Sequence, residues 1–369
     1  MKPEGDGEHF MRQALALARR GYGRTSPNPM VGAVLVRNNV VMGEGWHHAA
    51  GCPHAEIEAL EAVRRRGEKI EGATLYVTLE PCSTFGRTPP CSAAIIEAGI
   101  KRVVAAATDP NPAHQGQGFE ILRRAGIEVT CGLMEAEARQ LNEAFNHWIV
   151  HRTPFVTLKA GMTLDGKIAT RTFASRWITG EKARRDSMRR RAGHDAILVG
   201  VNTILRDDPQ LTVRERGFTN KILRRIVLDP RGRTPRGARV LQGAGALVVV
   251  TAAAPRRRVE RLQEQARVLC APTRGGQIDL QWLLATLGGE NVVSLLVEGG
   301  GETHARFLRA NLAQRALFYY APLIIGGAAA PKAVGGRGIL KLDEGLILRE
   351  PAWARVGDDL RLTALIQAR

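Results

Sequence analysis

The apolar positions of the first 150 residues change spacing several times, and each spacing predicts a helix or a strand. A helical stripe covers residues 8–20, and two short apolar runs at 31–36 and 40–46 flank a turn-like arginine and asparagine sequence that predicts a hairpin. Helix-like and strand-like segments then alternate. We predict helices over 53–66, 89–99 and 134–147, and strands over 73–80 and 101–108. This rhythm predicts a three-layer α/β unit with a parallel sheet.

After the sequence HRTP at 151–154 the alternation of strands and helices begins again. We predict strands over 155–160, 196–201, 224–229, 246–251, 292–298 and 316–325, and helices over 181–192, 255–267, 279–287 and 302–310. A chain of 369 residues is long enough for two domains. The pattern therefore predicts an α/β chain of two domains, residues 1–150 and 151–369.

Charge separates the same two halves. The formal net charge is +17, yet residues 1–150 carry 16 basic and 17 acidic side chains, whereas residues 151–369 carry 37 basic and 19 acidic ones. A strongly basic domain can bind nucleic acid or another polyanion. Its arginine clusters at 189–191 and 256–258 are typical of a solvated helix face, and they also fit a site for small phosphorylated molecules.

Nothing in the sequence predicts export or a membrane span. The first ten residues carry acids where a signal peptide needs a cationic or apolar stretch. The longest uncharged run, 316–331, is interrupted by Pro322, Gly326 and Gly327 and is too short to span a bilayer. We therefore expect a cytoplasmic protein that does not bind membranes. Its five cysteines fit reduced thiols that are available for a metal better than a disulfide framework.

Two short motifs in the first half have the spacing of a catalytic zinc site. His54 and Glu56 open a predicted helix, and Cys82 and Cys91 follow a predicted strand and open the next helix. This H-x-E…P-C…C pattern is the signature of zinc nucleobase deaminases. Residues two apart on a helix point to opposite sides, so His54 and Glu56 can serve one site only from the end of the helix.

His54, Cys82 and Cys91 would give zinc three ligands and leave its fourth tetrahedral position for water, as a catalytic site requires. Glu56 is then the expected proton shuttle between this water, the ring nitrogen and the departing ammonia. The alternative is a closed, structural zinc site in which Cys52 is the fourth ligand. A structural site would give no reason for an acid beside the histidine.

Longer motifs carry a resemblance that spans nearly the whole chain. The first half contains SPNPMVGAVLV (26–36), GEGWHHAAGCPHAE (43–56), PCSTFGRTPPC (81–91) and TDPNP (108–112). The second half contains LKAGMTLDGKIAT (158–170), SRWITG (175–180), DDPQLTVR (207–214) and VEGGGETHARF (297–307). With these motifs the chain resembles the bifunctional riboflavin-biosynthesis deaminase/reductases.

The resemblance implies a cytidine-deaminase-like α/β domain followed by a dihydrofolate-reductase-like α/β domain. It implies zinc-dependent deamination of 2,5-diamino-6-(5-phosphoribosylamino)pyrimidin-4(3H)-one. NADPH-dependent reduction of 5-amino-6-(5-phosphoribosylamino)uracil to the ribitylamino product would follow. It further implies a homodimer, or a higher homo-oligomer, that forms through the reductase domain.

The resemblance also assigns residues in the deaminase half. Asn28 and His47 would hold the pyrimidine, and Arg87 would lie near the substrate phosphate, although a solvated loop charge is the other reading of Arg87. Where the family commonly has a histidine in the zinc loop, this sequence has Ser83, Thr84 and Phe85. The details of substrate binding in this loop therefore differ from the family pattern.

In the reductase half, a predicted strand is followed by Gly299-Gly300-Gly301 and then by a predicted helix. Such a glycine-rich helix start is suited to binding phosphate. The alternative interpretation is an ordinary tight turn between strand and helix. By resemblance, the expected NADPH contacts are Gly161, Trp177, Thr203, Asp207, Gly300, Gly301, Glu302, Thr303, His304, Ala305 and Arg306. The expected substrate contacts are Ser175, Arg191, Leu211, Arg214 and Glu298. Lys159 and Glu298 are the candidates for steering protons at the sugar carbon.

Two other functions compete with this interpretation. A nucleic-acid deaminase would use the basic second half to bind RNA or DNA, but the deaminase half is near neutral and no recognised RNA-binding module is present. In the other alternative the second half is a non-catalytic binding or oligomerisation module. NADPH consumption separates a reductase from both, and we expect no nucleic-acid partner.

Overall fold

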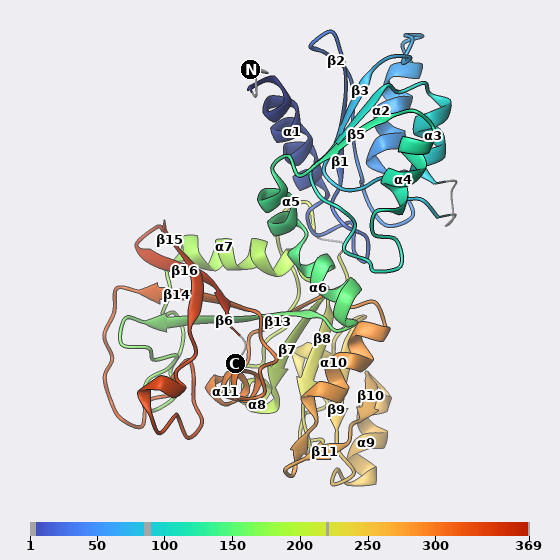
Figure 1. Cartoon of the computed structure of the whole chain (residues 1–369). Helices are drawn as coiled ribbons and strands as arrows, with labels where there is room; N and C mark the ends of the chain where they lie inside the picture. The colour runs from blue at the N-terminus through green and yellow to red at the C-terminus, as the bar shows by residue number, and fades with distance from the viewer. Residues whose placement is uncertain (1–4, 85–89, 219–220, 368–369) are drawn as a thin grey trace. The chain divides into compact units, whose positions relative to one another are not determined.

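A computed structural model of the chain describes residues 5–84, 90–218 and 221–367. The chain divides into two compact units, Met1–Arg152 and Thr153–Arg369, each with its own sheet (Figure 1). No helix within the described ranges combines the length and the apolar character that a bilayer span requires.

The first unit has a five-stranded sheet in the order β2-β1-β3-β4-β5. The predicted hairpin pairs β1 with β2, and β1 is also antiparallel to β3, whereas β3, β4 and β5 are parallel. The elements of this unit are α1 (Gly5–Ala18), a 3-10 turn (Arg19–Gly21), β1 (Gly32–Arg37), β2 (Val40–Trp46), α2 (Ala55–Arg64), β3 (Thr74–Val77), α3 (Cys91–Glu97), β4 (Arg102–Ala105), α4 (Gln117–Arg124), β5 (Glu128–Cys131), α5 (Glu135–Leu141) and α6 (Glu143–His151).

Helices cover both faces of this sheet, as the sequence predicted. Side chains of α1 and α5, including Met11 and Ala138, form one buried cluster with Val34 and Val104 of the sheet. Residues of α2, α3 and α4 form a second cluster on the opposite face (Figure 1). The first unit is therefore a three-layer α/β unit.

Two glycines on β2 let α2 lie directly on the sheet. A Cβ at Gly45 would lie 2.2 Å from the backbone oxygen of Ala55, and one at Gly43 would lie 2.5 Å from that of Ala59. Any side chain at these positions would push the helix away from the sheet. The two glycines thus fix the position of the N-terminus of α2, where the H-x-E motif lies.

The second unit has a nine-stranded sheet in the order β10-β9-β8-β7-β13-β6-β14-β16-β15. Strands β10 to β14 of this order are parallel, and the β15–β16 hairpin continues the sheet in the antiparallel sense. The elements are β6 (Phe155–Thr163), α7 (Glu181–Ala192), β7 (Ala196–Gly200), α8 (Val201–Asp207), β8 (Arg224–Leu228), a 3-10 turn (Arg239–Leu241), β9 (Ala246–Val250), α9 (Arg256–Gln263), β10 (Arg267–Cys270), β11 (Thr273–Arg274), β12 (Gln277–Ile278), α10 (Leu280–Gly289), β13 (Ser294–Val297), α11 (Gly301–Arg309), β14 (Arg315–Ala321), a 3-10 turn (Leu342–Glu344), β15 (Leu348–Val356) and β16 (Asp359–Ile366).

This second sheet also has helices on both faces. Leu283 of α10 and Phe307 of α11 pack with Leu158 and Leu198 on one face. Ala192 of α7 and Leu262 of α9 belong to the cluster on the other face. The second unit is therefore also built of three layers.

The sequence pattern missed several elements. The predicted helix over 134–147 is two helices, α5 and α6, which are separated at Asn142, where the backbone leaves the helical conformation (φ −108°, ψ 21°). The Asn142 side chain accepts from the N–H of Met30 and donates to its carbonyl. The helix expected over 255–267 ends at Gln263, and β10 begins at Arg267. α4, β5, α8 and the β15–β16 hairpin were not predicted.

Candidate functional site

His54 and Glu56 reach one site from the end of α2. His54 is the N-cap residue and has an extended backbone (φ −73°, ψ 162°), so its side chain is not bound to the helical spacing. Glu56 lies in the first turn of the helix and is only 3% exposed. The end-on arrangement expected from the sequence is the one found.

Cys82 and Cys91 approach the same place from two other elements. Cys82 follows β3, and the buried Cys91 is the first residue of α3. The backbone N–H of Cys91 donates to Cys82 Sγ (3.2 Å), and that of Ser92 donates to the carbonyl of Cys82 (3.2 Å). The N-terminus of α3 therefore holds the loop that carries Cys82.

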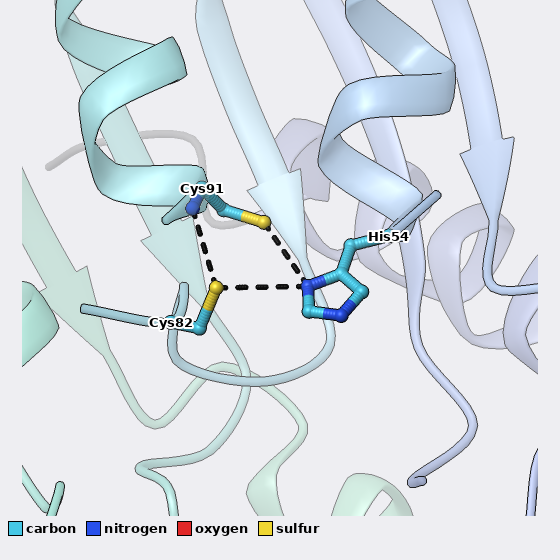
Figure 2. Close-up of side chains that lie close together, drawn as sticks. All are labelled: His54, Cys82 and Cys91. Atoms are coloured by element: carbon cyan, nitrogen blue, oxygen red, sulfur yellow. Dashed lines mark hydrogen bonds between the residues drawn. The ribbon is translucent and has the colours of Figure 1, made fainter. Parts of the chain in front are cut away.

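The three side chains form a compact set of metal-ligand atoms (Figure 2). His54 Nδ1 lies 3.2 Å from Cys91 Sγ and 3.6 Å from Cys82 Sγ. Two ligands of a tetrahedral zinc, at bond lengths of about 2.3 Å to sulfur and 2.0–2.1 Å to nitrogen, lie about 3.5 Å apart. Cys52, the fourth ligand of the alternative structural site, is exposed and lies outside this set. The donor atoms thus fit zinc with three protein ligands.

Burial and neighbouring charges change the acidity of these groups. A hydrogen bond from the Cys91 thiol lowers the pKa of Cys82 to about 4, and the same contact, together with burial, raises the pKa of Cys91. Burial, and then the charge of Cys82, raises the pKa of Glu56 to about 7. A carboxyl group with a pKa near neutrality can both accept and release a proton.

Asn28 and His47 lie together beside the metal-ligand set. His47 Nδ1 lies 3.0 Å from the carbonyl of Pro53, which can only accept, and His47 Nε2 lies 3.1 Å from Asn28 Nδ2. Burial lowers the pKa of His47, so the ring is neutral, donates from Nδ1 and accepts at Nε2. Its ring meets that of His54 edge to face, with centroids 5.4 Å apart. Arg87 lies outside the described residues.

In the second unit, three predicted side chains form one charge cluster. Arg191 of α7 donates to both oxygens of Glu298 (3.1 and 2.8 Å), and Lys159 Nζ of β6 lies 3.7 Å from Glu298 Oε2. Burial raises the pKa of Glu298, but the charges of Arg191 and Lys159 outweigh this effect and hold the pKa at about 2. Glu298 is therefore ionised at neutral pH.

A groove of about 1270 Å³ collects many of the remaining predicted residues. Its lining includes Ser175, Thr203, Asp207, Gly300, Gly301, Glu302, Thr303 and Arg306. Gly300 is the N-cap residue of α11, and a Cβ at this position would meet no atom within 4 Å. The glycine therefore leaves the helix N-terminus open, as phosphate binding requires.

The other predicted contact residues of the second unit are not among the residues that line this groove. Trp177 is 70% exposed and stacks on Arg184, and Arg214 lines a separate pocket beside α7. Leu211 packs in a core cluster, and both ring nitrogens of His304 face backbone carbonyls. The remaining two are Gly161, on β6, and the buried Ala305, on α11.

Apart from Arg306, the sequence did not identify the basic side chains that line the groove. Of the described residues that line it, three are acidic and seven are cationic: Arg206, Arg231, Arg233, Arg274, Arg306, Arg309 and Lys332. The excess of basic residues in the second half indicated a basic surface. It could not indicate where that surface lies, because the residues come from separate segments of the chain. The lining suits an anionic ligand.

Two family models match the chain. Residues 5–107 match the cytidine and deoxycytidylate deaminase zinc-binding region, and residues 154–362 match the RibD C-terminal domain. The riboflavin biosynthesis protein RibD of Aquifex aeolicus is 44% identical over 355 residues, which are 96% of this chain and 96% of that protein.

Two solved structures are similar to this chain over 98% of its length. RibD of Acinetobacter baumannii (form 1) is 36% identical and has a TM-score of 0.88, covering 98% of this chain and 99% of that one. A Thermotoga maritima protein described as a diaminohydroxyphosphoribosylaminopyrimidine deaminase/5-amino-6-(5-phosphoribosylamino)uracil reductase is 35% identical, with a TM-score of 0.84 and the same coverage.

These matches confirm the predicted fold class, a cytidine-deaminase-like α/β unit followed by a dihydrofolate-reductase-like one. They favour a reductase as the second unit over a nucleic-acid-binding or non-catalytic module. The match to a zinc-binding region also supports zinc as the metal for the His54, Cys82 and Cys91 set.

Proposed function

We propose residue roles from one premise: the chain belongs to the RibD family of riboflavin-biosynthesis proteins and is a bifunctional deaminase and reductase. The first unit would deaminate 2,5-diamino-6-(5-phosphoribosylamino)pyrimidin-4(3H)-one. The second would reduce the product, 5-amino-6-(5-phosphoribosylamino)uracil, with NADPH. We assign these activities to residues 1–150 and 151–369.

In the deaminase unit, His54, Cys82 and Cys91 would hold zinc, which supplies a Lewis acid that lowers the pKa of water toward about 7. Glu56 takes one proton from the attacking water and passes it to the ring nitrogen. It then takes the second proton, from the hydroxyl group formed on the ring carbon, and passes it to the amino group, which leaves as ammonia. Its burial beside the three ligands supports this role. His47 fixes the orientation of the Asn28 amide, and the two residues hold the pyrimidine. Arg87 would contact the phosphate.

In the reductase unit, the basic groove would bind NADPH, with its phosphates against the open N-terminus of α11. NADPH supplies the hydride that reduces the sugar carbon in the Schiff-base form of the substrate. Because Glu298 is ionised, it anchors Arg191 and Lys159 rather than donating a proton. Lys159 is then the donor for the substrate nitrogen. Ser175, Leu211 and Arg214 complete the proposed substrate contacts.

Two wider proposals follow from the family. A homodimer through the second unit would cover apolar side chains that the single chain exposes, such as Leu340 (96%), Leu342 (94%) and Trp353 (58%). A cytoplasmic location would keep the two cysteine ligands reduced and able to hold a metal.

The observation that carries the deaminase assignment is a buried carboxylate next to three metal-ligand side chains. Glu56→Gln keeps the size of the side chain but removes its basic oxygen. Because general acid–base catalysis is worth about 10²–10⁴-fold, deamination should fall by at least that order. Reduction of the deaminated intermediate should not change. The measurement is NADPH oxidation by one protein, given first the diamino precursor and then the deaminated intermediate.

The two substrates serve as controls for each other. Equal loss on both would mean that Glu56 supports the fold, and equal retention would mean that another group carries the proton. Either result would overturn the assignment of Glu56.

A further inference from the structure

Directly before Pro81 and Cys82 lies a buried carboxylate to which the proposed mechanism gives no role. Glu80 is 5% exposed. Its Oε2 accepts the backbone N–H groups of Asp109 (3.0 Å) and Gly116 (3.0 Å), and its Oε1 accepts those of Gly118 (2.9 Å) and Phe119 (3.4 Å). One side chain thus satisfies four backbone donors that lie 29 to 39 residues further along the chain.

The donors belong to the segment from Asp109 to Phe119, which connects β4 to the first turn of α4. A carboxylate is favourable at the N-terminus of a helix, where backbone N–H groups lack partners within the helix. The same segment also touches the residue after Glu80, because a Cβ at Gly118 would lie 2.1 Å from the carbonyl oxygen of Pro81. Glu80 and Pro81 are therefore packed tightly against the start of α4.

On its other side, the loop is bonded to α3. Cys82 accepts one N–H at its sulfur, from Cys91, and one at its carbonyl, from Ser92. Between these two attachments, to α4 through Glu80 and to α3 through Cys82, the chain has only one intervening residue, Pro81. The position of the Cys82 sulfur therefore depends on where Glu80 is held.

We propose that Glu80 is a positioning residue of the deaminase site, which holds the loop of Cys82 against the 109–119 segment and so sets the distance of the Cys82 sulfur from His54 and Cys91. The proposal rests on the proposed function in one respect, that these three side chains bind the metal. Groups that orient metal ligands typically contribute 10- to 100-fold to metal affinity or activity. Glu80 acts through Cys82 and does not touch the substrate.

Glu80→Gln tests the proposal because it keeps the size of the side chain but places an NH₂ group against two backbone N–H donors, which breaks that pair of bonds. The matched control is Glu120→Gln, an exposed acid on the same helix α4 whose described partner is Arg124. Gly118→Ala displaces the same loop with the charge of Glu80 intact. Each full-length protein is stripped of metal, checked for folding by circular dichroism and thermal unfolding, and titrated with Co²⁺ and with Zn²⁺ against a chelator.

We expect Glu80→Gln and Gly118→Ala to fold, to bind both metals about 10- to 100-fold more weakly, and to show a shifted visible spectrum of the cobalt–thiolate site. In deaminase assays at saturating zinc, kcat should fall more than KM rises. Glu120→Gln should match the unaltered protein. Unchanged metal affinity and cobalt spectrum in the folded variants would overturn the proposal.

Loss of folding in both variants would equally overturn it, because Glu80 would then serve the fold and not the site. If the unaltered protein itself binds neither metal through thiolates, the proposed function fails instead. The two failures are thus distinguishable.

Discussion

At the scale of single residues, neighbouring charges decide how two buried glutamates behave. Glu56 and Glu298 both lose water, which by itself raises a carboxyl pKa. The negative charge of Cys82 lies beside Glu56 and adds to the effect of burial, so the pKa of Glu56 rises to about 7. Beside Glu298 stand Arg191 and Lys159, and its pKa falls to about 2. The first can exchange a proton near neutral pH, whereas the second is a fixed charge.

The low pKa of Glu298 predicts how stability changes with pH. A carboxyl group whose folded pKa lies below its unfolded value of 4.5 stabilises the fold above that value, and the contribution is lost as pH falls toward about 2. At about 1.4 kcal/mol per pKa unit the loss is about 3 kcal/mol. We expect the free energy of unfolding of the second unit to fall by that amount more in the unaltered protein than in Glu298→Gln between about pH 5 and pH 2.

Urea unfolding of both proteins over this pH range measures the difference. Parallel curves for the two proteins would contradict the assignment of a low pKa to Glu298.

At the scale of elements, two neighbouring glycines at the N-terminus of α11 have different roles, one facing the proposed ligand and the other packed against the chain. A Cβ at Gly300 meets nothing within 4 Å, whereas one at Gly301 would lie 2.2 Å from the carbonyl oxygen of Lys332. Gly300→Ala should therefore leave stability unchanged and raise KM for NADPH, because the added methyl group stands where phosphate would bind. Gly301→Ala should lower the thermal stability of the second unit.

Thermal unfolding and NADPH titration of both variants make the comparison. An unchanged KM for NADPH in Gly300→Ala would contradict the proposal that a phosphate of NADPH binds at this helix end.

The sequence predicted those elements that have a regular pattern and clear ends. The helix expected over 181–192 is α7, with the same bounds, and the H-x-E helix is α2. α8 was missed because it follows β7 without any intervening turn residues, so that VGV reads as a continuation of the strand. β15 was missed because its residues, LREPAWARV, are mostly exposed and include a proline, which is typical of an edge strand and gives no alternation.

The candidate sites followed the same division. Two short motifs with the spacing of a zinc site contain His54, Glu56, Cys82 and Cys91. The sequence alone was therefore enough to predict that these four residues share one site. The basic lining of the groove comes from segments as distant as Arg206 and Lys332, and only the fold joins them. The four bonds of Glu80 likewise need the register of β3 and β4 and could not be predicted from spacing.

At the scale of the whole molecule, the two sites lie in units with separate sheets and separate cores. Residues 151–369 alone should therefore fold and reduce the deaminated intermediate with NADPH, with kinetics close to those of the full chain. Circular dichroism and NADPH oxidation test this expectation. A folded fragment that binds no NADPH would contradict the assignment of the cofactor to this unit.

Product analysis is the direct test that one chain carries out two consecutive reactions. The full-length protein is given the diaminopyrimidine phosphoribosyl compound with and without NADPH, and the products are identified by mass. Without NADPH, we predict a product in which one amino group has become an oxo group; with NADPH, we predict the same product with two further hydrogens on the sugar chain. Prior removal of zinc should abolish both products. An unchanged starting compound, or a deaminated product that NADPH does not alter, would show that the chain does not carry both activities.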